Sequence, residues 1–232
     1  MKARSDWDLS QYDNGMAFLD MLFNYLLAFA TLFLIALLLA QPNKAADAAV
    51  KLRAEFVLTL TWPDGALDDI DLWLMLPDGR RVNFRNKDAT IATLDRDDLG
   101  ALNDIYTDAD GKRQLTRINR EMITIRAIVP GRYVAAAHVY AARPQLQDGG
   151  DPNLIWRGEP ALPYPATLEV MKLNPHAETF IRASAQLREQ AQEAPLAAFE
   201  VDADGNVSNI ELNPAQYQIV ELAPLAGLET MR

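Results

Sequence analysis

The sequence of 232 residues contains no cysteine and only two histidines. A chain without cysteine forms neither a disulfide nor a thiolate metal site, and two histidines argue against a histidine-based metal site. Lysine and arginine total 22 against 32 aspartates and glutamates, which gives a net charge of -10. Because an acidic chain repels phosphate backbones, we expect no nucleic-acid partner.

Motifs of known catalytic chemistry are also missing from the sequence. No serine lies in a nucleophile elbow, and no glycine-rich loop of the kind that holds phosphates is present. His138 falls in a segment of alternating polarity, and His176 follows Pro175 in an expected loop. We therefore expect that the protein is not an enzyme.

One long apolar run stands near the N-terminus. From Met16 to Ala40, about 25 residues contain no lysine, arginine, glutamate, glycine or proline, and at roughly 1.5 Å per residue they exceed a hydrocarbon core of about 30 Å. The run predicts a transmembrane helix over 15–41, preceded by a tail (1–14) and followed by a linker (42–53). It is too long for the core of a cleaved signal peptide, so we expect it to be retained.

A single full charge, Asp20, lies inside this run. A carboxylate in lipid costs on the order of 2.5 kcal/mol or more unless it has a partner. Helical steps from Asp20 lead to Asn24, Ala28 and Thr31, so polar and small side chains form one stripe. Two interpretations follow: Asp20 marks the headgroup end of a passive anchor, or it binds and releases a proton or Na⁺ against a partner helix.

The pattern of a short polar tail followed by FLDMLFNYLLAFATLFLIALLLAQP resembles the single transmembrane helix of the ExbD, TolR and MotB families. The resemblance implies a homodimer of this helix inside a pentamer of multi-span ExbB-, TolQ- or MotA-type subunits. It also implies that an aspartate carries the ion that drives rotation, and Asp20 alone matches that residue. Asn24 and Thr31 are then expected to support the ion pathway.

The same resemblance implies a place in the cell. It predicts a protein of the bacterial inner membrane, with the N-terminus in the cytoplasm and the larger C-terminal part in the periplasm. Charges flanking the run do not decide the orientation, because Lys2 and Arg4 before it are matched by Lys44, Lys51 and Arg53 after it.

Beyond residue 54 the apolar pattern changes from a helical to an alternating period. Phe56, Leu58, Leu60 and Trp62 share one face of an expected strand over 55–62. Further strands are expected over 71–76, 81–84, 123–127, 133–139, 166–173, 199–201 and 207–212, whereas 179–187 fits a strand or a helix. Many short strands separated by turns predict a mainly β protein, with an antiparallel β-sandwich, a C-terminal hairpin and a tail filling 54–232.

Residues 54–175 carry a second resemblance. DDIDLWLM, LDRDDLG and VPGRYV stand in the order typical of YfaP-type domains, whose hallmarks are a D-x-D-L strand, an L-D-x-D-D loop and a P-G-x-Y turn. This resemblance implies an extracytoplasmic β-sandwich and says nearly nothing about activity.

Two groups of aspartates suggest a metal. Because Ca²⁺ takes six to eight oxygen ligands, such oxygen-rich groups are candidate calcium ligands. Solvated turns are the alternative, since neither group has EF-hand spacing. The candidates are Asp69 and Asp71 in one strand and Asp95, Asp97 and Asp98 in one loop.

The roles of two further segments are not determined by the sequence pattern. The Pro/Gly-rich stretch 141–165 fits a recognition loop or a covering flap, and 216–232 fits a docking tail.

The sequence thus favours the ion-carrying, dimeric inner subunit of a 5:2 proton- or sodium-driven motor, which moves an extracytoplasmic β domain against an envelope partner. The alternative is a passively anchored β-sandwich that binds glycan, protein or calcium.

Overall fold

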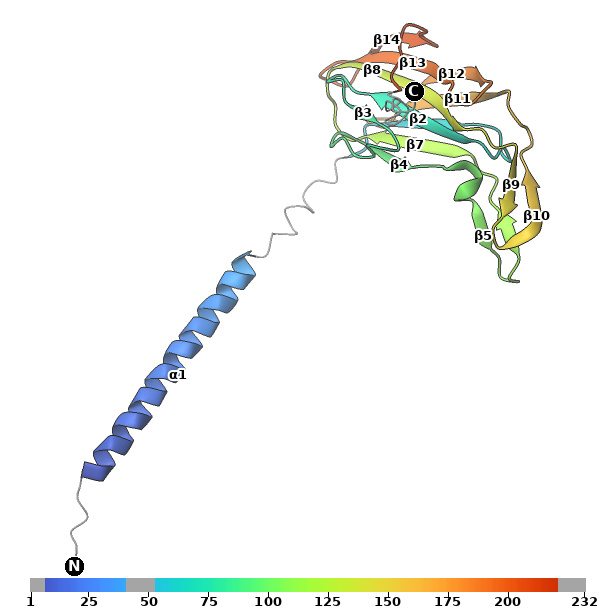
Figure 1. Cartoon of the computed structure of the whole chain (residues 1–232). Helices are drawn as coiled ribbons and strands as arrows, with labels where there is room; N and C mark the ends of the chain where they lie inside the picture. Colours follow the sequence, from blue (N-terminus) through green and yellow to red (C-terminus); the bar gives the residue numbers. More distant parts are fainter. Residues whose placement is uncertain (1–6, 41–52, 221–232) are drawn as a thin grey trace, which may run out of the picture. The chain divides into compact units, whose positions relative to one another are not determined.

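A computed structural model describes residues 7–40 and 53–220 (Figure 1). Contacts divide the chain into two compact units, Met1–Lys51 and Leu52–Arg232. Part of the predicted tail (1–6), most of the predicted linker (42–52) and the end of the predicted docking tail (221–232) lie outside the described residues.

The first unit contains one helix, α1 (Trp7–Ala40). It begins before the expected boundary at Gly15, so residues 7–14 are helical rather than an irregular tail. Within it, the 23 residues Gly15–Leu37 are long and apolar enough to cross a membrane. All side chains of this stretch are exposed, as expected for a helix whose apolar surface has no protein partner within the described chain. Length and composition alone do not separate a membrane anchor from a signal sequence.

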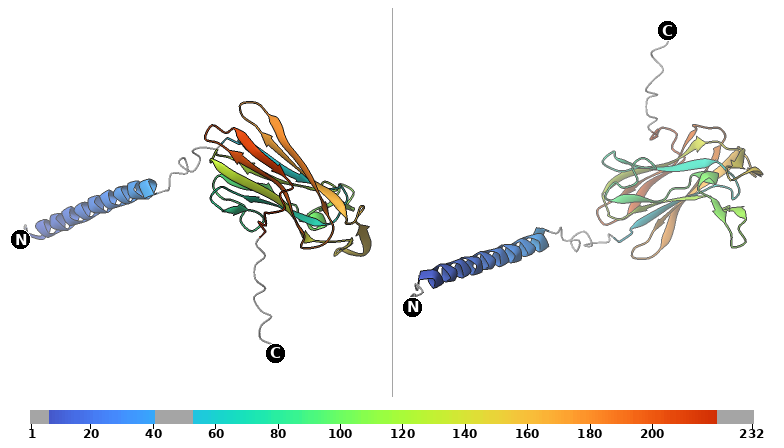
Figure 2. Two further views of the ribbon diagram at one scale, coloured as in Figure 1. Left: turned by 90° about the horizontal axis from the view of Figure 1, so that it is seen from above. Right: turned by 60° about the horizontal axis from the view of Figure 1, so that its bottom comes forward.

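The second unit is a β domain. Two five-stranded sheets have the orders β12-β11-β1-β7-β4 (sheet A) and β14-β13-β8-β2-β3 (sheet B), with all neighbours antiparallel. The two sheets form the layers seen in Figure 2. Two small hairpins, β5–β6 and β9–β10, complete the domain. The strands are β1 (Phe56–Thr61), β2 (Asp69–Met75), β3 (Arg81–Val82), β4 (Ala92–Arg96), β5 (Ile105–Thr107), β6 (Arg113–Leu115), β7 (Arg120–Ile125), β8 (Gly131–Ala141), β9 (Gln145–Asp148), β10 (Asp151–Arg157), β11 (Tyr164–Lys172), β12 (Glu178–Leu187), β13 (Glu193–Val201) and β14 (Val207–Leu212).

The expected fold class is confirmed: one apolar helix precedes a mainly β, antiparallel domain with two packed sheets. Alternation explains the packing, because Phe56, Leu58 and Leu60 of β1 point between the sheets and are at most 1% exposed. The segment 179–187 is part of strand β12, so its helical alternative was wrong. The segment 141–165 is not simply a loop, because it contains the β9–β10 hairpin.

The central strands of sheet B (β2, β8 and β13) are covered on the outward face as well as on the face towards sheet A. The outward face carries Trp73, Val134, Ala136 and Ala198, and these side chains pack against Ile219, which is 1% exposed. The carboxylate of Glu193 accepts hydrogen bonds from the backbone N–H groups of Ile219 (2.6 Å) and Val220 (3.3 Å). The described part of the expected docking tail therefore docks on its own domain.

Candidate functional site

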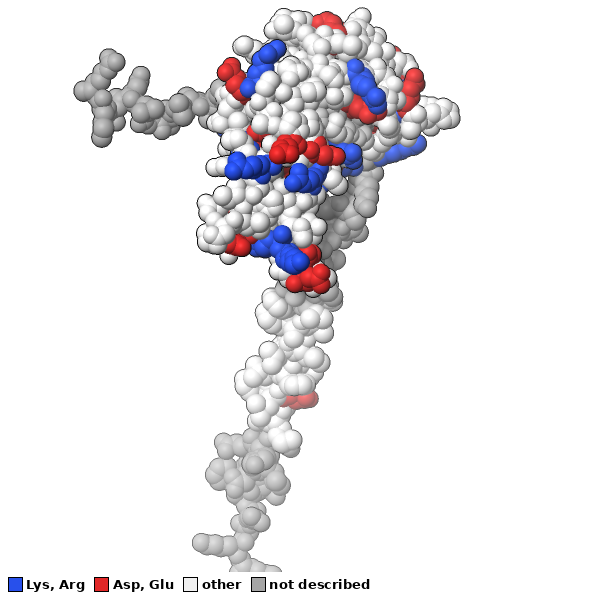
Figure 3. Space-filling view, turned by 90° about the vertical axis from the view of Figure 1, so that its right-hand side faces the viewer, with Lys and Arg blue, Asp and Glu red and all other residues white. Residues whose placement is uncertain are grey.

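Asp20 is the acidic residue in the stretch Gly15–Leu37, which contains no lysine, arginine or histidine. Its side chain is exposed, and Figure 3 shows acidic surface on the helix amid uncharged residues. At about 1.5 Å per residue, Asp20 lies roughly 7.5 Å along the axis from Gly15, inside the apolar stretch but close to one end. It borders a shallow groove lined by Ala17, Asp20, Met21, Asn24, Tyr25 and Ala28.

The polar residues Asn24 and Thr31, which follow Asp20 along the helix, differ in how well they can contact an ion at this groove. Asn24 lies one turn after Asp20 on the same face, and the alanines Ala17 and Ala28 leave space beside both polar side chains. The hydroxyl of Thr31 is already used, because it donates to the carbonyl oxygens of Leu27 (2.7 Å) and Ala28 (2.9 Å). Asn24 is therefore better placed than Thr31 to contact an ion held by Asp20.

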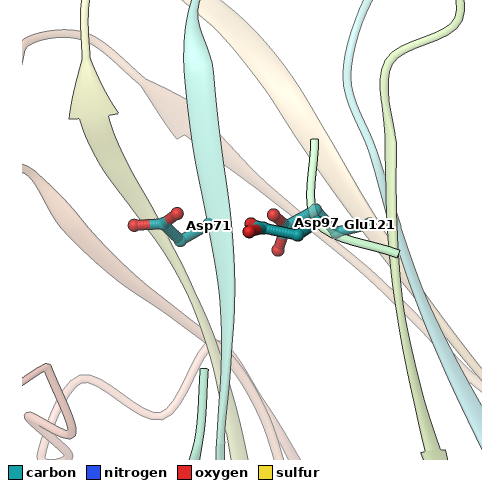
Figure 4. A group of neighbouring side chains, drawn as sticks. All are labelled: Asp71, Asp97 and Glu121. Carbon is teal, nitrogen blue, oxygen red and sulfur yellow. The ribbon is translucent and has the colours of Figure 1, made fainter. Parts of the chain in front are cut away.

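A second candidate site lies in the β domain, where sequence-distant carboxylates meet at the edge of β2. Asp71 of β2, Asp97 of the loop after β4 and Glu121 of β7 each contribute an oxygen, and these oxygens lie within 4.8 Å of one another. In Figure 4, Asp97 and Glu121 overlap on one side of the β2 ribbon and Asp71 lies on the other. This arrangement arises because β3 pairs only with Leu74 and Met75, which leaves the preceding edge of β2 uncovered by a strand.

Glu121 takes the place of the missing strand at that edge. Its carboxylate accepts a hydrogen bond from the backbone N–H of Leu72 (2.5 Å) and another from the N–H of Asp98 (3.2 Å). The donors follow Asp71 and Asp97 directly in the chain, so one fully buried side chain holds the backbone next to both of these residues. Burial raises the pKa of Glu121 well above its ordinary value, and the charge of Asp71 raises it further.

Asp69 and Asp71 occupy alternate positions of β2 and so project from the same face. Asp71 lies 3.2 Å from Nδ1 of His138, and Asp69 lies 3.5 Å from a guanidinium nitrogen of Arg143. Burial, followed by the negative charge of Asp71, raises the pKa of Asp69 to about 7. Burial also raises the pKa of Asp71, against the opposing effect of His138.

Asp97 connects the cluster to the surface. One of its oxygens accepts a hydrogen bond from Nζ of Lys87 at 2.7 Å, and its side chain is 16% exposed. Its other oxygen is buried and has no hydrogen-bond partner. The same holds for Oδ1 of Asp69, whose side chain is only 3% exposed.

The other two sequence candidates have structural partners elsewhere. Asp98 accepts hydrogen bonds from the N–H groups of Gly100 (3.1 Å) and Arg120 (3.0 Å) and pairs with Arg96 at 3.1 Å. Asp95 bonds the hydroxyls of Thr93 and Thr124 and pairs with Arg126. The structure therefore brings Asp71 and Asp97 together, places Asp69 beside Asp71, and assigns Asp95 and Asp98 to separate contacts.

A glycine allows the loop of Asp97 and Asp98 to lie against β2. Gly100 has φ +58°, and a Cβ there would lie 2.6 Å from the carbonyl oxygen of Leu67 and 2.7 Å from that of Asp68. The adjoining Asp68 side chain is held by the hydroxyl of Tyr164 (2.7 Å) and the N–H of Arg143 (2.6 Å). The loop and the start of β2 thus form one rigid unit next to the carboxylates.

Glu121 was missed by the sequence interpretation. The signal was present, because Glu121 shares its strand face with Ile123 and Ile125, which are both fully buried. A carboxylate at an inward position of a strand needs a specific partner. Its partners lie 49 and 23 residues away in the chain, so only the fold reveals them.

The end of the domain where β1 finishes carries exposed apolar side chains. There the two small hairpins are joined by an ion pair between Arg113 and the buried Asp148 at 3.2 Å, and Figure 1 shows β5, β9 and β10 at this end. Apolar side chains between 38% and 56% exposed belong to these hairpins or to neighbouring turns: Leu99, Leu102, Tyr106, Ile118 and Ile155.

Comparisons with known proteins assign no function. No family model and no curated protein sequence matches the chain. Among solved structures, a protein titled "unknown function protein SAV2460" is similar over 71% of this chain and 94% of that chain, with 16% sequence identity and a TM-score of 0.37. A similarity of this size carries no argument about fold or activity.

Proposed function

We propose that this chain is the ion-carrying, dimeric inner subunit of a 5:2 proton- or sodium-driven motor in a bacterial inner membrane. Asp20 is the residue that takes and releases the ion, with Asn24 one turn away as its nearest polar neighbour. The observation that carries the proposal is a single carboxylate on an apolar helix whose stretch Gly15–Leu37 offers no cation to pair with it.

The need for other subunits follows from the cost of that carboxylate. An unpaired aspartate within a membrane helix is costly, up to about 2.5–3.5 kcal/mol at the centre, and such residues generally face protein or a water-filled cavity. Residues 15–37 provide only Asn24, Tyr25 and Thr31 as further polar side chains, and Thr31 already bonds its own helix. A surrounding ring of multi-span subunits would supply both a polar path and a surface against which Asp20 exchanges its ion.

In this proposal the N-terminus lies in the cytoplasm and the β domain lies in the periplasm. The domain has its own core and its own buried charge network, so it is suited to act as a rigid body that passes a displacement to an envelope partner. The exposed apolar side chains beside the β5–β6 and β9–β10 hairpins are the surface we assign to that partner.

The same hairpin surface supports a second candidate function. If α1 is only an anchor, the protein is a membrane-tethered binding module whose ligand contacts Leu102, Tyr106 and Ile155. The two functions make different demands on the helix, because a passive anchor needs no carboxylate and no surrounding subunits.

The test is to co-express the full chain with the products of its neighbouring genes and to measure the mass of the complex purified in mild detergent. We expect two copies of this chain with five copies of a multi-span subunit. The mass of the purified chain also shows whether α1 has been retained, as the proposal requires. Recovery of the chain alone, or of a chain cleaved after α1, would contradict the motor and favour the binding module.

Asp20→Asn is the matched control for this experiment. The neutral amide has nearly the same shape, so we expect the variant to assemble with the same stoichiometry as the native chain. A variant that assembles separates the role of Asp20 in ion transfer from any role in assembly.

A further inference from the structure

The carboxylates at the edge of β2 carry more negative charge than the surrounding residues balance. Asp69, Asp71, Asp97 and Glu121 lie there, and Asp69, Asp71 and Glu121 are at most 2% exposed. The neighbouring positive groups are Arg143 and Lys87 at the rim, together with His138 when it is protonated. Glu121 itself contacts backbone N–H groups rather than a cation. Buried charges of one sign need a counter-ion or a proton.

Two buried carboxylate oxygens without a hydrogen-bond partner, one on Asp97 of the group and one on the neighbouring Asp69, point to a ligand. Oδ1 of Asp69 has no hydrogen-bond partner, although the side chain of Asp69 is only 3% exposed. Asp69 projects from the same face of β2 as Asp71, and the charges of Asp71 and Asp97 both act on it. Oδ1 of Asp97 is buried and unpartnered as well. An unbonded buried carboxylate oxygen is costly, whereas a cation would fill its lone pairs.

The spacing of the oxygens fits one ion. Ca²⁺ binds oxygen ligands at about 2.3–2.6 Å, so two ligands on opposite sides of the ion lie up to about 4.6–5.2 Å apart. Asp71, Asp97 and Glu121 each offer an oxygen within 4.8 Å of the others. Because these donors are all carboxylate oxygens, hard cations are favoured over zinc or copper, which prefer nitrogen and sulfur ligands.

The site is also fixed in advance and accessible. Asp71 lies in β2 and Glu121 in β7, and Glu121 holds the backbone immediately after Asp71 and immediately after Asp97, which ties the loop of Asp97 to the two strands. The 16% exposed side chain of Asp97 provides a route from solvent. Lys87, 55% exposed at its side chain, can move away when the ion enters.

We propose that Asp71, Asp97 and Glu121, with Asp69 beside them, form a Ca²⁺ site in the β domain. Asp71 and Asp97 were also calcium candidates in the sequence, as was the neighbouring Asp69. Glu121 is new to the site, whereas the candidates Asp95 and Asp98 are not part of it. It does not rest on the motor function, because all of its residues lie outside α1.

The experiment uses the full chain in detergent, freed of metal with a chelator and then titrated with CaCl₂ by isothermal calorimetry. We expect saturable binding of one ion per chain. The melting temperature of the β domain, followed by tryptophan fluorescence, should rise by about 5 °C at a Ca²⁺ concentration near 100 times the dissociation constant. No heat of binding and no change in melting temperature would overturn the proposal, as would a response to Mg²⁺ alone.

Paired variants locate the ion. Asp97→Asn lies at the accessible rim and should weaken Ca²⁺ binding at least tenfold while the domain remains folded. Asp95→Asn is the matched control, because Asp95 lies in the same chain segment but contacts Arg126 and Thr124 instead of the proposed ion. Its Ca²⁺ affinity should equal that of the native chain. Equal affinity in Asp97→Asn, or equal losses in the two variants, would place the ion elsewhere.

Two further variants complete the test. Glu121→Gln keeps an oxygen that can accept a hydrogen bond from one of the two N–H groups, and we expect it to bind Ca²⁺ more weakly than the native chain. This variant replaces Asp97→Asn in the test if Asp97→Asn fails to fold. Asp20→Asn should bind Ca²⁺ normally, so failure of the calcium site and failure of the motor remain distinguishable.

Discussion

Asp20 and Asp98 are carboxylates of the same chain in opposite surroundings. Asp98 has no exposed surface, and two backbone N–H groups and one arginine lie within 3.1 Å of its oxygens. Asp20 lies on an exposed helix whose stretch Gly15–Leu37 contains no basic residue. In Figure 3, acidic and basic groups lie side by side on the face of the domain shown. The stretch Gly15–Leu37 of the helix contains Asp20 and no basic residue.

This difference shows how far each unit supplies partners for its own charged and apolar side chains. The β domain supplies a second layer for its apolar faces and partners for buried carboxylates such as Asp98, and only the group at the edge of β2 is short of positive charge among the charges described above. The helix supplies neither a partner for Asp20 nor cover for its apolar side chains. In the proposed motor, lipid and the other subunits would supply both.

Replacing phenylalanine in each unit should give the largest contrast. Phe199 is fully buried and stacks on Tyr133 with ring centroids 5.5 Å apart. Phe199→Ala should lower the free energy of unfolding of the domain by about 3–5 kcal/mol. Phe29→Ala, on an exposed face of α1, should leave it unchanged. Chemical denaturation followed by fluorescence measures both, and a comparable loss in Phe29→Ala would contradict the independence of the two units.

Removing a buried carboxylate should have a smaller but still large effect. Asp98→Ala leaves the N–H groups of Gly100 and Arg120 and the guanidinium of Arg96 without their acceptor, so we expect a loss of about 3 kcal/mol. Asp110→Ala, at an exposed turn position, is the control and should change stability by less than about 0.5 kcal/mol. A neutral effect of Asp98→Ala would mean that the buried network does not hold the loop.

The smallest expected effect depends on pH. Burial, followed by the charge of Asp98, raises the pKa of Asp104 from 3.8 to about 6. The folded domain therefore holds this proton more tightly than the unfolded chain, so its free energy of unfolding decreases as pH rises from about 4 through about 6. Asp104→Asn removes this penalty. It should be more stable than the native chain at pH 8 by about 1 kcal/mol, after allowance for solvent screening, and the advantage should vanish near pH 4. An equal advantage at both pH values would show a packing effect instead.

The local pattern of the sequence predicted much of the fold. Alternating apolar residues predicted strands that correspond to β1, β2, β7, β8 and β11, because each has a face buried in the core between the sheets. The strand predicted over 207–212 corresponds to β14, although most of its side chains are exposed. The predicted transmembrane segment starts at Gly15, as does the apolar stretch Gly15–Leu37, while the helix itself continues back to Trp7 through the largely polar residues 7–14. Polarity does not prevent the helical hydrogen bonds of α1 from continuing in this direction. The β9–β10 hairpin was missed because proline and glycine in 141–165 indicated a loop.

The candidate sites differ in how far the sequence could predict them. Asp20 is conspicuous because the residues next to it in the sequence are apolar. On a lone helix these same residues form its surroundings, so the sequence alone shows its environment. The cluster of Asp71, Asp97 and Glu121 joins β2, the loop after β4 and β7, so it depends on strand order and register. The sequence grouped Asp95, Asp97 and Asp98 because they are adjacent, whereas the fold directs these three side chains to different partners.

Ion flux is the measurement that tests the central claim most directly. The purified complex would be placed in liposomes, and proton or sodium uptake would be followed for the native chain, Asp20→Asn and Thr31→Val. Because a neutral amide cannot take up and release the ion, Asp20→Asn should reduce uptake to the level of empty liposomes. Thr31→Val should stay within about twofold of the native rate, since that hydroxyl bonds its own helix. Undiminished uptake by Asp20→Asn would contradict the assignment of Asp20 as the ion carrier.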